Sequence, residues 1–152
     1  IVMANVGLPI CAKTSKYKPI KLITSMRTTD SLTDDSSYFF SELTRLKFIV
    51  DTIAEDKNYF VILDEILKGT NSTDKAIGSR KFVEKLVGQN ATGIIATHDL
   101  SLTEIETELD AVKNYYFDAE IKNDELFFDY KLKKGVCQNM NASFLLKKME
   151  IV

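Results

Sequence analysis

Two short apolar runs, each ending abruptly on polar residues, constrain what this chain can fold into more than any other feature. The first run, residues 60–63, is followed by Asp64 and Glu65, and the second, residues 93–97, leads into His98. Such runs are typical of strands that are buried on both faces of a parallel sheet. Ligands collect at the carboxyl ends of these strands. We therefore expect Asp64, Glu65 and His98 to lie at one edge of one sheet, as in a nucleotide hydrolysis site.

The order of the expected elements predicts an α/β fold. We expect strands over residues 20–27, ending at Asp64 and ending at Thr97, and helices over 37–55, over 73–86 with Gly88 as the stop, and from a capping-box pattern at 101–104. Strands that alternate with helices indicate a mostly parallel sheet with helices on both of its faces.

The pattern changes after residue 114. Apolar residues alternate over 115–121 and again over 126–132, around a turn at 122–125, which predicts a β-hairpin with one face packed inward. A last helix is expected over about 141–149. We treat residues 1–152 as one domain, or most of one.

Composition limits the classes of function. A hydrophobic fraction of 45% is enough for a core, and a formal net charge of −2 disfavours direct DNA binding by this chain. Cys11 and Cys137 lie far apart and form no metal-ligand spacing, so we expect reduced thiols in a cytoplasmic protein. No apolar run approaches the roughly 20 residues of a membrane-spanning helix.

The consecutive carboxylates Asp64 and Glu65 can do two different jobs, because neighbouring side chains of an extended chain point in opposite directions. One can hold the water shell of Mg²⁺ while the other polarises a water that attacks a phosphate, as phosphoryl transfer requires. The imidazole of His98, the single histidine, can donate a hydrogen bond to a terminal phosphate. A chance Asp-Glu pair and an ordinary surface histidine are the alternatives.

Two polar loops allow more than one interpretation. Residues 69–74 can bind a ligand or simply form a turn and a helix cap, and the same holds for residues 33–37. Glu42 is most simply a favourable charge near the start of a helix. The chain contains no Gly-x-x-x-x-Gly-Lys-Ser/Thr motif, and its first residues look cut from a longer protein, where the phosphate-binding loop (P-loop) would precede them.

Together these residues resemble the MutS family of mismatch-repair ATPases, over nearly the whole chain. Residues 1–12 resemble the helix after the P-loop, which ends in a Gly-x-x-x-x-Ala turn, and residues 30–43 resemble the signature segment. Residues 63–74 (Leu-Asp-Glu-Ile-Leu-Lys-Gly-Thr-Asn-Ser-Thr-Asp) match the Walker B and D-loop pattern, and residues 96–98 (Ala-Thr-His) match the switch histidine. The resemblance implies the C-terminal part of a three-layer, ABC-class P-loop NTPase domain whose P-loop portion is missing.

The resemblance also implies roles for individual residues. Asp64 would serve the Mg²⁺ shell, Glu65 would be the catalytic carboxylate and His98 the γ-phosphate sensor. Three further residues would face the nucleotide of a second, identical subunit in composite ATP sites: Ser37, Glu42 and Asp74. The parent protein would couple ATP binding and hydrolysis to dimer closure and to DNA, which it would engage through regions outside this chain.

Some positions depart from the family pattern. Leu67-Lys68 stands where repair members usually have Gly-Arg, Lys75 where they usually have Gly, and Asp34-Asp35 where a Gly-basic pair is common. These differences suggest a divergent branch. Two rivals are another ABC-class ATPase head, disfavoured by the absence of a Leu-Ser-Gly-Gly-Gln signature, and a catalytically idle dimerisation module. For lack of the P-loop, we expect the chain alone to be inactive.

Overall fold

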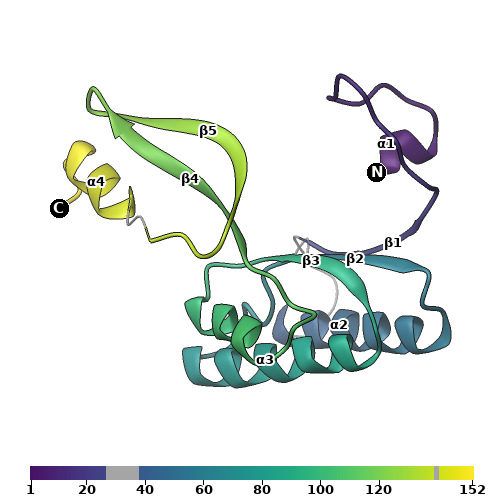
Figure 1. The fold of residues 1–152 in the computed structure, drawn as a ribbon. Coiled ribbons are helices and arrows are strands. Elements are labelled where there is room, and N and C mark those ends of the chain that lie inside the picture. Colours follow the sequence, from purple (N-terminus) through teal and green to yellow (C-terminus); the bar gives the residue numbers. More distant parts are fainter. Residues whose placement is uncertain (27–37, 139–140) are drawn as a thin grey trace. The chain divides into compact units, whose positions relative to one another are not determined.

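The computed structural model describes residues 1–26, 38–138 and 141–152 of the chain. These residues form two compact units, Ile1–Leu102 and Thr103–Val152 (Figure 1). The candidate residues at strand ends all belong to the first unit, which is described first.

The first unit contains a three-stranded parallel sheet. Its strands are β1 (Lys21–Ser25), β2 (Tyr59–Asp64) and β3 (Thr92–Ala96), in the order β1-β2-β3. The register pairs Asp64 at the end of β2 with Ala96 at the end of β3. The carboxyl ends of β2 and β3 are therefore level at one edge of the sheet, and the predictions of a parallel sheet and of this common edge are confirmed.

Two long helices, α2 (Tyr38–Glu55) and α3 (Ser72–Gly88), lie on the same face of this sheet (Figure 1). The strand order β1-β2-β3 explains this arrangement. When successive parallel strands are added in one direction across a sheet, right-handed crossovers place every connecting helix on the same face. The prediction of helices on both faces is therefore not confirmed for the described residues. A short helix, α1 (Val2–Asn5), precedes β1.

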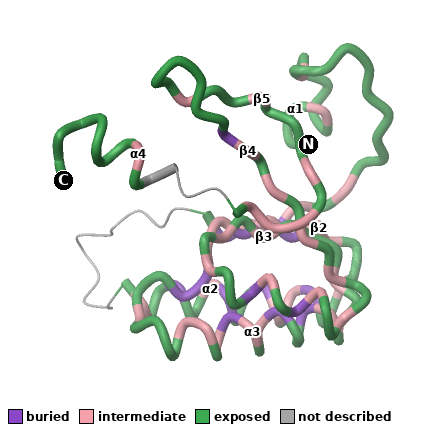
Figure 2. Tube along the Cα trace, turned by 60° about the vertical axis from the view of Figure 1, so that its left-hand side comes forward, coloured by how far each residue is buried: buried purple, intermediate pink, exposed green. Residues whose placement is uncertain are grey.

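The core of the first unit lies between the helices and the sheet. Its buried residues belong to both long helices and to the strands β1 and β2, and the buried segments are coloured purple in Figure 2. They include Ile23 of β1, Ile49 and Ile53 of α2, Val61 and Leu63 of β2, and Val83 and Leu86 of α3. Gly93 lets β3 approach β2 closely, because a Cβ atom there would lie 2.4 Å from the carbonyl oxygen of Val61.

The segment that links the units differs from its prediction. Residues Leu100–Thr107 form a 3₁₀ helix, η1, which begins before the predicted capping box. The side chain that stabilises its start is that of Asp99, whose Oδ1 accepts hydrogen bonds from the backbone N–H of Ser101 (2.9 Å) and from its hydroxyl (2.6 Å). The predicted short helix is present, but its start differs from the prediction, because Asp99, two residues before Ser101, provides the cap.

The second unit contains the predicted hairpin, β4 (Tyr115–Lys122) and β5 (Glu125–Lys134), and the predicted last helix, α4 (Asn141–Lys148). Asn123 and Asp124 at the hairpin turn have φ of 50° and 62°, as a two-residue turn of this hand requires. The prediction of one face packed inward is wrong for the hairpin as described. Only Ala119 is buried, whereas Phe117 and Tyr130 are 63% and 82% exposed.

Candidate functional site

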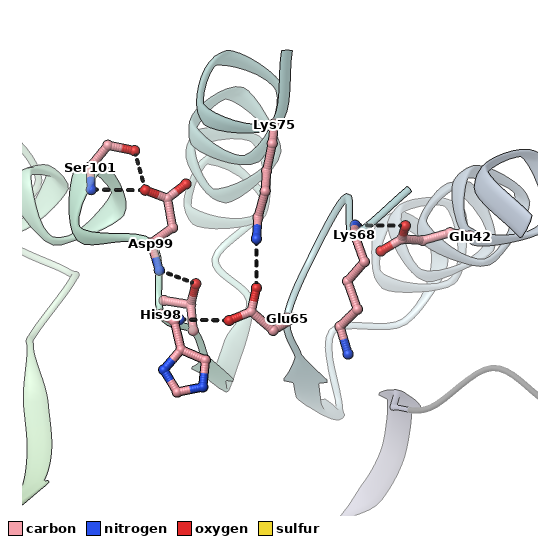
Figure 3. A network of polar contacts seen from close by, with 8 residues as sticks. Glu42, Glu65, Lys68, Lys75, His98, Asp99 and Ser101 are labelled. Atoms are coloured by element: carbon pink, nitrogen blue, oxygen red, sulfur yellow. Dashed lines mark hydrogen bonds and ion pairs between the residues drawn. The ribbon is translucent and has the colours of Figure 1, made fainter. Parts of the chain in front are cut away.

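The residues at the carboxyl ends of β2 and β3 meet as the two apolar runs predicted. Asp64 is the last residue of β2, and the next residue, Glu65, donates its backbone N–H to the carbonyl oxygen of Ala96 on β3 (2.8 Å). The side chain of Glu65 then reaches across to the backbone of His98. Figure 3 shows Glu65 between the loop after β3 and the first turn of α3.

The backbone turns sharply directly after β2. Glu65 and Leu67 both have positive φ, 62° and 56°, in the left-handed region that residues with a Cβ atom rarely occupy. Each such residue costs of order 1–3 kcal/mol and persists only where its surroundings hold it. Ile66 and Leu67 are buried, so apolar packing fixes this turn. As a result, the Glu65 side chain points away from the direction of β2.

The carboxylate of Glu65 is held through both oxygen atoms. Oε1 accepts a hydrogen bond from the backbone N–H of His98 (2.6 Å), and Oε2 accepts one from Nζ of Lys75 (2.7 Å). Partial burial raises the pKa of Glu65, but the bonds from Lys75 and His98 outweigh it and hold the pKa below its ordinary value. Glu65 is thus a carboxylate of fixed orientation that stays ionised at neutral pH.

His98 contributes its backbone rather than its ring to this contact. The residue is exposed, and its imidazole points away from Lys75 in Figure 3. The loop around it is ordered by short-range bonds, since the backbone N–H of Asp99 donates to Oγ1 of Thr97 (3.0 Å). The imidazole is therefore free to meet a ligand at the strand edge.

Glu42 lies in the interior next to this edge. Glu42 is only 4% exposed, and its Oε2 accepts a hydrogen bond from the backbone N–H of Lys68 (3.0 Å) (Figure 3). A buried carboxylate is stable only where such partners compensate for its lost hydration. Glu42 thereby ties α2 to the loop that follows β2, a contact that its position near a helix start did not indicate.

A shallow hollow joins several of these residues. It is lined, within the described part of the chain, by Ser25, Met26, Tyr38, Glu42, Asp64, Glu65 and Lys68. The hollow thus brings together three predicted site residues, and Lys68 adds a positive charge to the carboxylates. Asp74 and His98 are not among its described lining residues.

Asp74 belongs to the start of α3. Asn71 caps this helix, because its Oδ1 accepts the backbone N–H of Asp74 (3.0 Å) while its Nδ2 donates to Oδ2 of Asp74 (2.7 Å). Asp74 is exposed at this reciprocal cap. The cap interpretation of the 69–74 loop is thus correct, and it leaves the proposed role of Asp74 toward a second subunit untested. Ser37 lies outside the described residues.

In the part of the chain that the structure describes, Asp64 is suited to bind Mg²⁺ together with water and phosphate, although no complete set of protein ligands is present. Among the described residues, no group of three or more His, Cys, Asp or Glu side chains is arranged to hold a metal ion. Mg²⁺ is nevertheless commonly bound by one or two carboxylates together with water and substrate phosphates. Asp64, at the end of β2 and in the lining of the hollow, suits that kind of binding.

Sequence reasoning missed the two lysines of the site. Lys75 binds Glu65, and Lys68 offers its backbone N–H to Glu42. The pattern of the sequence gave no signal for either contact, because each depends on how a loop with positive φ angles folds back.

Among the residues that the structure describes, no helix is long and apolar enough to cross a membrane.

Comparison with known proteins assigns the chain to a family. Residues 1–149 match the family model described as MutS domain V. The chain is 32% identical to human MutS protein homolog 4 over 158 aligned positions, covering 99% of this chain and 16% of that protein. It is 30% identical to DNA mismatch repair protein MutS of Aquifex pyrophilus (84% of this chain, 16% of that protein).

A third relative, DNA mismatch repair protein MSH4 of Arabidopsis thaliana, is 26% identical over 98% of this chain and 19% of its own length. The chain therefore spans less than a fifth of the length of these relatives. The match to the domain model nevertheless extends over almost every residue, including both strand ends of the candidate site. This chain belongs to the MutS family, in the region of its domain V.

Proposed function

We propose that this chain is the C-terminal portion of a MutS-like ATPase domain, in which Asp64, Glu65 and His98 form one side of an ATP hydrolysis site. The observation that most supports this is the double hold on Glu65, which fixes an ionised carboxylate beside the end of β2. Strained backbone and a restrained charge are typical of functional sites.

In this proposal the chain's residues share the work of phosphoryl transfer. Asp64 would hold the water shell of Mg²⁺, whose positive charge would stabilise the phosphate oxygens. Glu65 accepts a hydrogen bond from the attacking water and orients it, and the imidazole of His98 donates a hydrogen bond to the terminal phosphate. The described sheet and its helices would be part of a three-layer, ABC-class P-loop fold in which another segment covers the second face.

The site is proposed to be composite. Ser37 and Asp74 would face the nucleotide of a second, identical subunit, and the exposure of Asp74 at the start of α3 supports this role. Glu42 would act at the same interface from the hollow, where its carboxylate also holds the loop at Lys68. ATP binding would then favour the closed dimer, because each nucleotide would contact both subunits.

The names of the relatives extend the proposal to DNA. Proteins named for DNA mismatch repair align with this chain over most of its length. We propose that the full-length protein couples ATP use to a DNA mismatch or another DNA structure through regions outside this chain. Its location would be intracellular, where such DNA is found.

The experiment that tests this function is ATP turnover by the full-length protein, with and without duplex DNA that contains a mismatch or a branch. We expect Mg²⁺-dependent turnover that changes when DNA is added. Turnover that ignores every DNA structure would contradict the coupling to DNA. The isolated chain, whose sequence has no P-loop motif, is expected to show no turnover, and Mg²⁺-dependent hydrolysis by it would contradict that part of the proposal.

A second candidate function is an idle interaction module. The observation that favours it is the amount of exposed apolar surface on the second unit, which includes Phe117, Phe127, Tyr130 and Leu132 of the hairpin. Exposed apolar surface of this kind often marks an interaction site. Absence of Mg²⁺-dependent turnover in the full-length protein would favour this candidate over the ATPase.

A further inference from the structure

The ion pair between Lys75 and Glu65 joins the site to helix α3. Nζ of Lys75 lies 2.7 Å from Oε2 of Glu65, and the two side chains are only 24% and 15% exposed (Figure 3). Other ion pairs on the helices of this unit are more open to water. Lys47 and Asp51, for example, are 75% and 54% exposed. Water therefore screens the Lys75–Glu65 pair less than an ordinary surface pair.

Lys75 is itself placed by the start of α3. Its backbone N–H donates to the carbonyl oxygen of Asn71 (2.9 Å), and Asn71 caps the helix through the backbone N–H of Asp74 (3.0 Å). The lysine thus extends from a capped first turn and not from a loose loop. A long side chain anchored in this way loses less freedom when it binds, because its backbone is already fixed.

Glu65 depends on this contact for its orientation. Among the residues that the structure describes, one other group donates to this carboxylate, the backbone N–H of His98 (2.6 Å to Oε1). A single bond leaves the carboxylate able to rotate about it, whereas bonds to both oxygens fix the plane of the group. The remaining lone pairs of the two oxygens stay available to a water molecule.

We infer that Lys75 is a positioning residue for Glu65, which it holds in the orientation that the attacking water requires. This inference rests on the proposed function, because it gives Glu65 the task of orienting water. In this role Lys75 acts through Glu65 and not directly on the water or the phosphate. Its effect is to keep the carboxylate plane fixed between α3 and the loop after β3, so that no reorganisation is needed at the moment of reaction.

The test compares three variants of the full-length protein: Lys75→Met, Lys75→Arg and Lys81→Met. Methionine keeps most of the length of the lysine side chain and removes its charge, and arginine restores a cation. Lys81 is an exposed lysine of the same helix, so Lys81→Met is a matched control for the loss of one charge from α3.

We expect Lys75→Met to lower kcat for ATP hydrolysis about tenfold or more, with KM for ATP little changed, as for a reacting group that is slightly misplaced. Lys75→Arg should recover most of that loss, and Lys81→Met should have no effect. A kcat that stays equal or rises in Lys75→Met, or a change in KM alone, would overturn the inference.

A second readout does not depend on activity. If Lys75 holds Glu65 against the loop after β3, hydrogen exchange at the backbone N–H of His98 should become faster in Lys75→Met and stay unchanged in Lys81→Met. Unchanged exchange in both variants would overturn the inference even if ATP turnover fell.

The failure of this inference and the failure of the proposed function are distinguishable. If Glu65→Gln abolishes turnover while Lys75→Met leaves kcat and His98 exchange as in the wild type, the positioning role is wrong and the ATPase proposal stands. If Glu65→Gln hydrolyses ATP as fast as the wild type, the proposed function fails and the inference fails with it.

Discussion

Glu65 shows how a single residue can combine backbone strain with a restrained charge. Its φ of 62° is unfavourable for a residue with a Cβ atom, yet the residue is fixed on three sides. Its backbone N–H binds Ala96, and its carboxylate binds Lys75 and the backbone of His98. We interpret the strain as the cost of turning a carboxylate away from the strand and toward the loop after β3.

Glu42 gives a prediction about stability at the same scale. Replacing Glu42 with Ala leaves the backbone N–H of Lys68 without its acceptor beside the hollow, so we expect a loss of about 1–3 kcal/mol in the free energy of unfolding. Glu42→Gln keeps an acceptor oxygen and should lose less. Chemical denaturation of the variants checks this.

The matched control for Glu42 is Glu55→Ala, which changes an exposed glutamate at the other end of α2. It should alter the free energy of unfolding by no more than about 0.5 kcal/mol. Equal effects of Glu42→Ala and Glu55→Ala would show that the Glu42–Lys68 contact does not stabilise the fold.

At the scale of elements, the start of α3 depends on its cap. Asn71→Ala removes the acceptor of the Asp74 N–H, and we expect the protein to lose about 1 kcal/mol of unfolding free energy. Asn71→Ser keeps a cap oxygen without adding a negative charge beside Asp74, so it should lose less stability than Asn71→Ala. Thermal or chemical unfolding distinguishes the two, and equal stability of Asn71→Ala and the wild type would contradict the role of the cap.

The contact between Lys21 on β1 and Asp56 after α2 predicts a pH dependence. The hydrogen bond from Lys21, and that from the backbone N–H of Asn58, hold the pKa of Asp56 below its ordinary value despite slight desolvation. Because the folded state binds this proton less tightly than the unfolded state, the contribution to stability is present above the unfolded pKa of Asp56. It is lost as the pH falls through the folded pKa.

The measurement is the titration of the Asp56 carboxyl group by NMR. In Lys21→Met its pKa should rise toward the ordinary value. Lys47→Met, which removes a lysine paired with Asp51, should leave the pKa of Asp56 as it is. A titration of Asp56 that is identical in the wild type and Lys21→Met would contradict the assignment of the shift to Lys21.

The elements themselves followed from the sequence where periodicity was strong. The two apolar runs predicted β2 and β3, and spacing of three and four residues predicted α2. The helix predicted over 73–86 with Gly88 as its stop corresponds to α3 to within two residues at each end. Periodicity reports which side of an element is apolar, but it does not report what covers that side. This is why the prediction of helices on both faces of the sheet and that of a buried hairpin face were not borne out in the described residues.

The candidate site was predictable only in part, for a related reason. Asp64, Glu65 and His98 follow strand ends, and strand ends are visible in a sequence. Lys68 and Lys75 join the site because the backbone turns back at Glu65 and Leu67, neither of which is a glycine that would announce positive φ. Contacts that depend on such a turn produce no periodic pattern of apolar residues in the sequence.

At the scale of the whole molecule, the described residues form two units with different surfaces. The first unit has a core of buried apolar side chains between its helices and its sheet, whereas in the hairpin of the second unit only Ala119 is buried, and Phe117 and Tyr130, with Leu146 of α4, are exposed. The chain spans less than a fifth of the length of its relatives. The activity proposed here therefore belongs to the full-length protein, and its central test has to be made there.

That test is the rate of ATP hydrolysis by full-length Glu65→Gln beside the wild type, with ATP binding measured in both. Glutamine keeps the size of the side chain and removes the charge that orients water. We predict that Glu65→Gln binds ATP as the wild type does but loses hydrolysis by about a hundredfold or more, while Glu108→Gln, outside the proposed site, hydrolyses ATP normally. Wild-type hydrolysis in Glu65→Gln would contradict the account.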